Sequence, residues 1–511
     1  MRISARNLPS CMALTIGSTL VLSISSFGAG ATRNRGGMLD ALGLDFLAYG
    51  HGGAVSNLFF FWSLVVLIGT WALAGRRFVF QSTRPEAERL REIRRLLFAQ
   101  ILCLIPAAPM LSRDVYSYLM QGAMVRDGFD PYTQGAAINP GPMLLEVSFD
   151  WRNTTTPYGP LHLWIGNVIT HIVGQNVTLG VLLYKIVSIL GFFAIAWAIP
   201  RIADRLGASP TLALWIGVSN PLMVLHMVGG MHNESIMVGL VSLGLLCALR
   251  RRFLLSVALV GVAVSLKATA AIALPFIVWL AVRAFGGDRH APRGRRIGAF
   301  ILSGAIGVVE TIAVVSLVTW VSGSSWGWLS EISGNSKVIN PLALPSLLAN
   351  LVTPFFQLGN DDFSYNTPLG IFRTISMVCM LVGLVLVWWF FRSDARRALT
   401  GICAAYLVAF VFNSVTLPWY YASIISLLGV ISLPKPLIKW VIGVSIVLTL
   451  AFAGSGNHML YNVGWMVATA LGAWILADLS MGPRRRVSLA HAAGQDPAEG
   501  EATPPSPAPA A

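Results

Sequence analysis

The sequence predicts an all-α protein that crosses a membrane many times. Of its 511 residues, 55% are hydrophobic and only 11% are charged, and the mean hydropathy is +0.69. Soluble domains carry about 25% charged residues, so a soluble protein is excluded. The apolar residues form long runs, and the basic residues cluster between these runs. By the length needed to span a bilayer, the runs predict about 12–14 transmembrane helices.

The net charge of +14 does not indicate nucleic-acid binding. Lys and Arg lie in short clusters between apolar segments, which is the pattern of the positive-inside rule. The five cysteines all lie in apolar runs and form no C-x-x-C pair. They are therefore expected to be buried small hydrophobes, with no role in disulfides or metal binding.

Residues 1–95 are predicted to hold two transmembrane helices and a basic cytoplasmic loop. The first helix, Cys11–Ala31, ends in a small-residue sequence that also fits a signal-peptide cleavage site, but no soluble region follows it. Ala54–Gly75 returns to an arginine-rich stretch that marks the cytoplasmic side. The next apolar segment, Leu96–Leu111, is therefore expected to cross outward.

Residues 96–321 are predicted to form the core, with a first large extracytoplasmic loop at 112–176. Apolar residues recur at helical spacing over Val115–Val125, which predicts an amphipathic helix in the membrane interface. Leu161–Gly174 is too short to span a bilayer and is expected to be a second interfacial helix. Two extracytoplasmic helices should therefore flank the polar part of this loop.

One apolar run in the core, Phe253–Val282, is too long for a single crossing. Its length of about 30 residues corresponds to ~45 Å of helix, and both of its ends are basic. It is therefore predicted to form two short helices that turn near Ser265–Thr269, with Lys267 outside. A second extracytoplasmic loop is expected at 322–367, C-terminal transmembrane helices at 368–483 and a disordered cytoplasmic tail at 484–511.

This topology collects polar residues on the extracytoplasmic side. They are Asp114, Tyr116, Asp127, Asp130, Tyr158, His232, Glu234, Lys267, Lys337, Trp419 and Tyr420. Cytosolic nucleotide sugars cannot reach that side, so an activated substrate would arrive there on a lipid. Transfer from a lipid phosphate needs a carboxylate to deprotonate the acceptor hydroxyl and a cation to hold the leaving phosphate. Asp114 and Lys267 match these two roles.

Each candidate also has a purely structural alternative. Asp114 has Arg113 as a neighbour for a simple ion pair, and Lys267 is long enough to snorkel to the interface. His232–Glu234 is placed to cap the following helix, and Trp419–Tyr421 fits an aromatic belt. Asp127 and Asp130 beside Gly128 are expected to form a turn. No His, Cys and acid residues have metal-ligand spacing, and no Walker or G-x-S-x-G pattern occurs.

Several motifs follow one another in a consistent order between about Asp40 and Leu479. They are Ser112-Arg-Asp-Val-Tyr-Ser-Tyr118, Gln121-Gly122, Asp127-Gly-Phe-Asp-Pro-Tyr132, Thr156-Pro-Tyr-Gly-Pro160, Asn220-Pro221, Gly229-Gly-Met-His-Asn-Glu234, Lys267-Ala-Thr269, Ile339-Asn340 and Leu417-Pro-Trp-Tyr-Tyr421. In these motifs the chain resembles the actinobacterial polyprenol-phosphate-mannose-dependent α-(1→6)-mannosyltransferases. These are GT-C glycosyltransferases that build the mannan backbone of lipomannan and lipoarabinomannan. The length and short tail look closest to the A-type enzyme.

The resemblance implies a GT-C fold, decaprenyl-phosphate-β-mannose as donor and a membrane-anchored mannan as acceptor. A β donor that gives an α product implies inversion with one general base, which maps onto Asp114. No cofactor or divalent metal is indicated, and the expected partners are the donor, the acceptor and membrane lipids. By position, the residues expected to contact substrate are Arg113, Tyr116, Tyr158, His232, Glu234, Lys267, Trp419 and Tyr420.

Two other functions remain open from the residues alone. The same scaffold could use another polyprenyl-phosphate sugar, such as arabinose or glucose. A transporter or flippase for a lipid-linked sugar is a different class, which predicts inverted repeats and charges at the membrane midplane. The charges of this chain instead gather at one face in two large loops, which favours an enzyme.

Overall fold

The computed structural model describes residues 10–287, 290–334 and 339–482, and these residues fold into helices joined by turns. The helices are α1 (Cys11–Ala29), α2 (Met38–Ala41), α3 (Gly50–Ala74), α4 (Glu86–Leu104), α5 (Asp114–Arg126), α6 (Pro142–Glu146), α7 (Pro160–Val173), α8 (Val177–Arg205), α9 (Pro210–Gly217), α10 (Pro221–Met223), α11 (Glu234–Leu249), α12 (Phe253–Val264), α13 (Leu274–Gly286), α14 (Arg293–Ser322), α15 (Trp328–Gly334), α16 (Leu344–Gln357), α17 (Asn366–Phe391), α18 (Ala395–Phe412), α19 (Ala422–Leu428), α20 (Lys435–Thr449) and α21 (Val463–Met481). The predicted all-α class is confirmed. Lys337 and the expected tail at 484–511 lie outside the described residues.

The length and composition of the helices confirm a multi-pass membrane protein. Within the described part of the chain, eight helical segments are long and apolar enough to cross a bilayer. They are Cys11–Ala29, Gly50–Phe80, Val177–Arg205, Ala268–Gly286, Arg293–Ser322, Asn366–Phe391, Ala395–Phe412 and Val463–Met481. A ninth span results if α9 and the segment Pro221–Gly229, which are bent by 53°, are counted together. The estimate of about 12–14 also counted shorter helices such as α11 and α12.

The boundaries of one expected crossing were wrong. The helix that precedes the first large loop, α4, spans Glu86–Leu104, whereas an apolar crossing was expected at Leu96–Leu111. It begins earlier because the arginine-rich stretch is itself helical. It ends earlier because Pro106 and Pro109 cannot continue a helix. The extended segment after α4 carries the chain to Asp114.

The long apolar run after residue 252 is split as predicted. Helix α12 ends at Val264, a turn follows, and a 3₁₀ turn, η6 (Ala268–Ala273), leads into α13. The backbone N–H groups of Gly159 and Leu161 donate hydrogen bonds to the carbonyls of Leu266 and Ser265. These bonds fix the turn that carries Lys267 against the start of α7.

Helix α5 is buried inside the protein to a greater extent than an interfacial helix requires. Nine of its residues are buried, because α5 packs against α6, α7 and α8. Its closest approach is to α7, where a Cβ added to Gly122 would lie 2.2 Å from the backbone carbonyl carbon of Gly166. The two helices are so close here that Gly122 leaves no room for a side chain, and this glycine contact holds α5 and α7 together.

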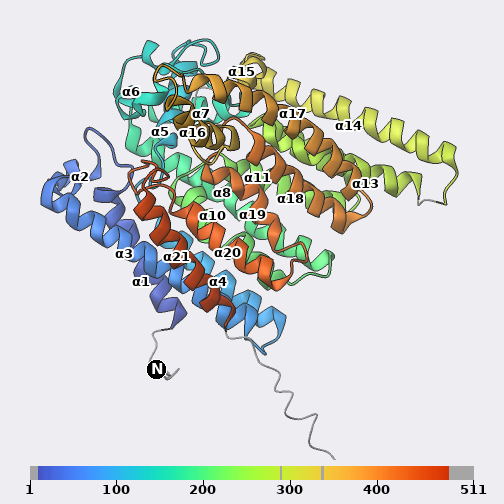
Figure 1. The fold of residues 1–511 in the computed structure, drawn as a ribbon, viewed down its shortest axis with the longest axis horizontal. Helices are drawn as coiled ribbons and strands as arrows, with labels where there is room; N and C mark the ends of the chain where they lie inside the picture. Colours follow the sequence, from blue (N-terminus) through green and yellow to red (C-terminus); the bar gives the residue numbers. More distant parts are fainter. Residues whose placement is uncertain (1–9, 288–289, 335–338, 483–511) are drawn as a thin grey trace, which may run out of the picture.

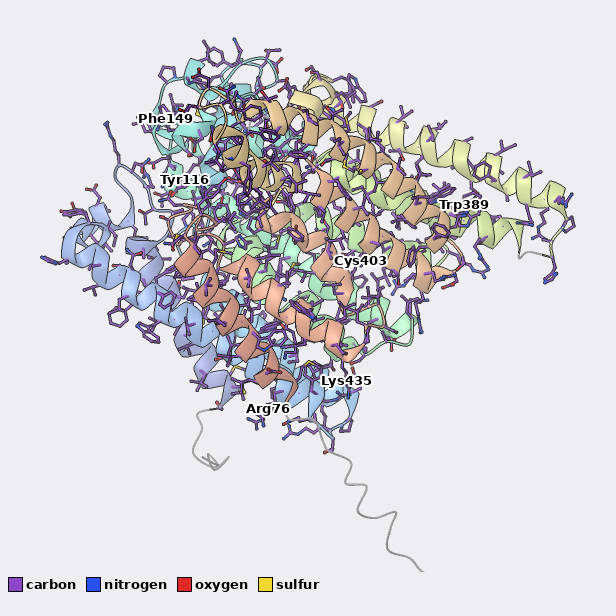
Figure 2. The ribbon with its side chains drawn as sticks, in the orientation of Figure 1. Arg76, Tyr116, Phe149, Trp389, Cys403 and Lys435 are labelled. Atoms are coloured by element: carbon purple, nitrogen blue, oxygen red, sulfur yellow. The ribbon has the colours of Figure 1, made fainter. Side chains whose placement is uncertain are left out.

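The two large loop regions lie at the same end of the molecule. Figure 1 shows α5, α6 and α7 grouped there with α15 and α16. A Cβ on Gly327 would lie 2.7 Å from the Cβ of Tyr132, so the start of the second region rests directly on the first. Trp328 is buried there. Figure 2 places Tyr116 and Phe149 at this end and Arg76 and Lys435 at the opposite end.

We expect Gly122→Ala to destabilise the protein, because the added methyl group overlaps the backbone of α7. Overpacking of this kind costs roughly 1–3 kcal/mol. Thermal unfolding of the purified protein should show a lower Tm than wild type. The matched control is Gly17→Ala on α1, where a Cβ meets nothing within 4 Å, and its Tm should be unchanged or slightly higher. Equal Tm values for both variants would contradict the close contact between α5 and α7.

Candidate active site

A cavity of about 240 Å³ opens between the two loop regions. Its wall is formed by Asp114, Ser117, Tyr118, Gln121, Trp151, Thr154, Thr155, Pro157, Tyr158, Glu331, Val415, Leu417 and Tyr420. These residues come from α5, from the rest of the first loop, from α15 and from the segment around the 3₁₀ turn η8 (Pro418–Tyr421). Three of the expected site residues, Asp114, Tyr158 and Tyr420, therefore line one cavity.

Asp114 is the first residue of α5 and is largely buried. Its backbone N–H donates to Ser112 Oγ at 3.1 Å, and its Oδ2 accepts a long hydrogen bond of 3.5 Å from the Tyr118 hydroxyl. The same oxygen lies 3.4 Å from His232 Nδ1, within ion-pairing distance. The carboxylate therefore lies next to Tyr118 and His232 and borders the cavity.

The neighbouring residues Arg113 and Tyr116 face away from this cavity. Arg113 pairs with Glu146 at 3.3 Å and donates to the Thr32 carbonyl, so the alternative of an Arg113–Asp114 ion pair is wrong. The Tyr116 hydroxyl donates to the Ala31 carbonyl. Tyr116 lines a larger, mainly apolar cavity of about 1110 Å³ between α1, the following loop and α8. Positions two apart on a helix lie on different faces, which separates Tyr116 from Asp114.

Lys267 forms a buried ion pair with Glu234, the first residue of α11. The ammonium lies 3.9 Å from the ring centroid of Tyr420 and 5.5 Å from that of Tyr158. Burial alone would lower the pKa of Lys267, but the Glu234 carboxylate raises it above its ordinary value. Lys267 is therefore charged directly behind two tyrosines of the cavity wall, and it does not snorkel to the surface.

His232 and Trp419 form a stacked pair beside Asp114. Their ring centroids are 3.7 Å apart and their planes differ by 17°, and both side chains are buried. The stack holds the imidazole with Nδ1 toward Asp114. Trp419 and Tyr420 are interior residues, so the alternative of an aromatic belt is wrong for both.

A relay of buried polar side chains, which the sequence did not reveal, supports Gln121. Asn233 precedes α11, but its side chain makes no cap and its amide reaches His162 Nδ1 at 3.4 Å. His162 Nε2 lies 3.0 Å from Gln121 Oε1. Burial and the nearby charge of Lys267 lower the pKa of His162 to about 3, so this histidine is neutral. In the sequence, the only indication of a role for Gln121 and Asn233 was that they lie in the motifs Gln121-Gly122 and Gly229–Glu234.

Glu331 of α15 is a second acid at the cavity that the site prediction did not include. Its carboxylate accepts a hydrogen bond from Thr155 Oγ1 of the first loop. Asp127 and Asp130, in contrast, have structural roles: Asp130 takes part in the expected turn, and Asp127 forms an ion pair instead. Asp127 pairs with Arg126, and Asp130 accepts from the backbone N–H of Tyr132 in the turn.

The described residues hold no group of three or more His, Cys, Asp or Glu placed to bind a metal ion. The charged groups of the site are instead carboxylates and a lysine. A polar cavity lined by carboxylates and aromatic rings, at one end of a polytopic helical protein, favours the class of membrane-embedded glycosyltransferases.

Comparison with known proteins supports this class and gives the family. Residues 12–283 match the family model described as "Alpha-(1->6)-mannopyranosyltransferase, N-terminal domain", and residues 343–481 match the "MptB C-terminal domain". The chain belongs to the α-(1→6)-mannopyranosyltransferase family and is a mannosyltransferase.

Relatives of both types were found. Alpha-(1->6)-mannopyranosyltransferase A of Corynebacterium glutamicum is 58% identical over 465 residues, which cover 89% of this chain and 95% of the relative. The A protein of Mycobacterium tuberculosis is 35% identical over 93% of this chain and 90% of its own length. Alpha-(1->6)-mannopyranosyltransferase B of Corynebacterium glutamicum is 28% identical over 78% of this chain and 69% of its own. The similarity is thus greater to these A proteins than to this B protein.

We expect Lys267→Met to destabilise the protein strongly, because it leaves the Glu234 carboxylate buried without its partner. Removal of one member of a buried ion pair costs roughly 3–5 kcal/mol. The double variant Lys267→Met/Glu234→Gln removes both charges and should recover most of the lost stability. Thermal unfolding of the three proteins measures this difference. A single variant as stable as wild type would contradict a buried ion pair.

The low pKa of His162 predicts a loss of stability in acid. The unfolded chain binds a proton at this histidine near pH 6.5, whereas the folded protein binds it only near pH 3. Above about pH 6.5, protonation of this histidine does not affect the free energy of unfolding. Below that pH, the free energy of unfolding falls by up to ~1.4 kcal/mol per pH unit as the pH drops toward 3. Plots of Tm against pH should be shallower for His162→Gln than for wild type. Parallel plots would contradict a buried neutral His162.

Proposed function

We propose that this mannosyltransferase transfers mannose from decaprenyl-phosphate-mannose to a growing α-(1→6)-mannan of lipomannan or lipoarabinomannan. The observation that carries the proposal is that one cavity is bordered by Asp114 and by the tyrosines in front of Lys267. A general base and a leaving-group cation are the two groups that transfer from a lipid phosphate requires. The names of the relatives support mannose and the (1→6) linkage.

In the proposed step, Asp114 accepts the proton of the acceptor 6-hydroxyl as its oxygen attacks the anomeric carbon of mannose. The bond between that carbon and the phosphate oxygen breaks, and the lipid phosphate leaves with the bonding electrons. Attack on a β donor from the opposite side gives the α product in a single displacement. His232 and Tyr118 keep the Asp114 carboxylate oriented toward the acceptor.

Lys267 neutralises the charge that develops on the leaving phosphate. An ammonium group has three N–H donors, and Glu234 accepts one of them, so donors remain for phosphate oxygens. Glu234 therefore keeps the lysine charged and in place before the donor binds. The mechanism uses lysine as the cation and includes no metal or other cofactor.

The proposed site is extracytoplasmic. Arg76, in the arginine-rich stretch expected to be cytoplasmic, and Lys435 are at the end of the molecule opposite to the cavity region (Figure 2). The positive-inside rule places the basic end in the cytoplasm and the cavity on the other side. A donor carried by a membrane lipid reaches such a site without passing through water.

The central test is transfer of labelled mannose from decaprenyl-phosphate-mannose to a short α-(1→6)-mannoside. Loss of a general base typically lowers the rate by about 10²–10⁴-fold, so Asp114→Asn should lose at least two orders of magnitude at unchanged Tm. The matched control is Asp127→Asn, because Asp127 lies outside the cavity and pairs with Arg126. It should keep activity close to wild type.

Two outcomes would contradict the proposal. Activity retained in Asp114→Asn would place the general base elsewhere. An inactive wild-type protein with this donor would overturn decaprenyl-phosphate-mannose as the substrate.

A further inference from the structure

We propose that Gln121, Trp151 and Glu331 form a subsite for the sugar of the acceptor, beside the carboxylate that deprotonates it. This inference rests on the proposed function, because it takes the acceptor to be a neutral saccharide. It assigns the part of the cavity wall that Gln121, Trp151 and Glu331 form.

Residues along one face of α5 line the cavity. Asp114, Ser117, Tyr118 and Gln121 all line the cavity and are spaced as i, i+3, i+4 and i+7, which is one face of a helix. Gln121 is therefore about 10 Å from Asp114 along the helix axis. The cavity extends past the general base, so a sugar whose hydroxyl reaches Asp114 has the rest of its ring near Gln121.

The side chain of Gln121 is oriented by the buried polar residues His162 and Asn233. Its oxygen faces His162 Nε2 at 3.0 Å, and His162 Nδ1 faces the Asn233 amide at 3.4 Å. A neutral imidazole has one N–H, and the Asn233 amide donates to Nδ1, so Nε2 carries the proton and donates to Gln121. The amide nitrogen of Gln121 makes no hydrogen bond among the described residues, and it remains as a donor at the cavity wall.

Glu331 provides a hydrogen-bond acceptor at the wall of the same cavity. Glu331 uses one carboxylate oxygen for Thr155 Oγ1, which leaves the other oxygen for a ligand. Sugar hydroxyl groups both donate and accept hydrogen bonds, so an amide N–H and a carboxylate oxygen together suit them. Trp151, which also packs against the buried cluster around α5, adds an apolar surface for the ring.

Charge separates an acceptor from the donor phosphate at this wall. Asp114 and Glu331 both line the cavity, and a carboxylate repels a phosphate strongly in a low-dielectric site. A phosphate is therefore unfavourable beside them and favourable beside Lys267. The volume of about 240 Å³ is below the roughly 300–1,000 Å³ of pockets for drug-sized ligands, which fits a sugar unit and not a lipid chain.

The test is steady-state kinetics of the full-length protein with each substrate varied in turn. In Glu331→Gln, which keeps the size and the bond to Thr155, we expect the KM for a short α-(1→6)-mannoside to rise roughly tenfold or more. The KM for decaprenyl-phosphate-mannose should stay within about twofold of wild type. Gln121→Glu, which removes the amide donor, should act in the same direction.

Controls separate binding from folding. Asp361→Asn changes an exposed acid of the same external region and should leave both KM values unchanged. Trp151→Phe keeps an aromatic ring in the packed loop, so its effect on the acceptor KM is readable even if Trp151→Ala fails to fold. Thermal unfolding of each variant confirms that the folded protein is compared.

The outcomes distinguish this subsite from the proposed function as a whole. A wild-type protein without transfer activity would overturn the proposed function and this subsite with it. An active wild type whose variants keep the acceptor KM, or raise only the donor KM, would overturn the subsite alone. A selective rise in the acceptor KM in Glu331→Gln and Gln121→Glu would support it.

Discussion

The buried ion pair between Lys267 and Glu234 is the interaction on which the arrangement of the site depends. An unpaired charge in a membrane protein costs several kcal/mol, so each residue holds the other in the interior. Lys267 lies in the turn after α12 and Glu234 begins α11, so the pair fixes the relative position of these helices. The start of α7 is tied to the same turn by two backbone hydrogen bonds. Three segments therefore meet at one charged centre.

The remaining part of the cavity is held by neutral groups. The Asn233–His162–Gln121 relay carries no net charge, and the glycine contact between α5 and α7 brings its two helices together. Lys267 lies behind two tyrosines of the cavity wall, and Gln121 and Glu331 add a neutral and an acidic group to the same wall. These groups match the two proposed substrates, since one carries a phosphate and the other is a neutral sugar.

Much of the fold followed from the sequence because length and charge determine it. The number of residues between basic clusters predicted the break near Lys267, and hydropathy predicted the all-α membrane fold. The end of α4 was predicted too far along the chain, because Pro106 and Pro109 end the helix within an otherwise apolar run. The gathering of Asp114, His232 and Lys267 was predicted from topology alone.

Pairings between distant segments could not be read from the sequence. Arg113 meets Glu146 across 33 positions, and Thr155 meets Glu331 across 176, although each of these polar residues had closer neighbours in the chain. Such contacts depend on how the loop regions pack, which no local pattern encodes. The same holds for Tyr116, whose direction depends on where α5 begins.

The most direct measurement is a cryo-EM structure of the wild-type protein with decaprenyl phosphate, the leaving group of the proposed reaction. We expect phosphate density within hydrogen-bond distance of Lys267 Nζ, beside Tyr158 and Tyr420. Phosphate density elsewhere, for example in the larger apolar cavity lined by Tyr116, with Lys267 still bound only to Glu234, would contradict it.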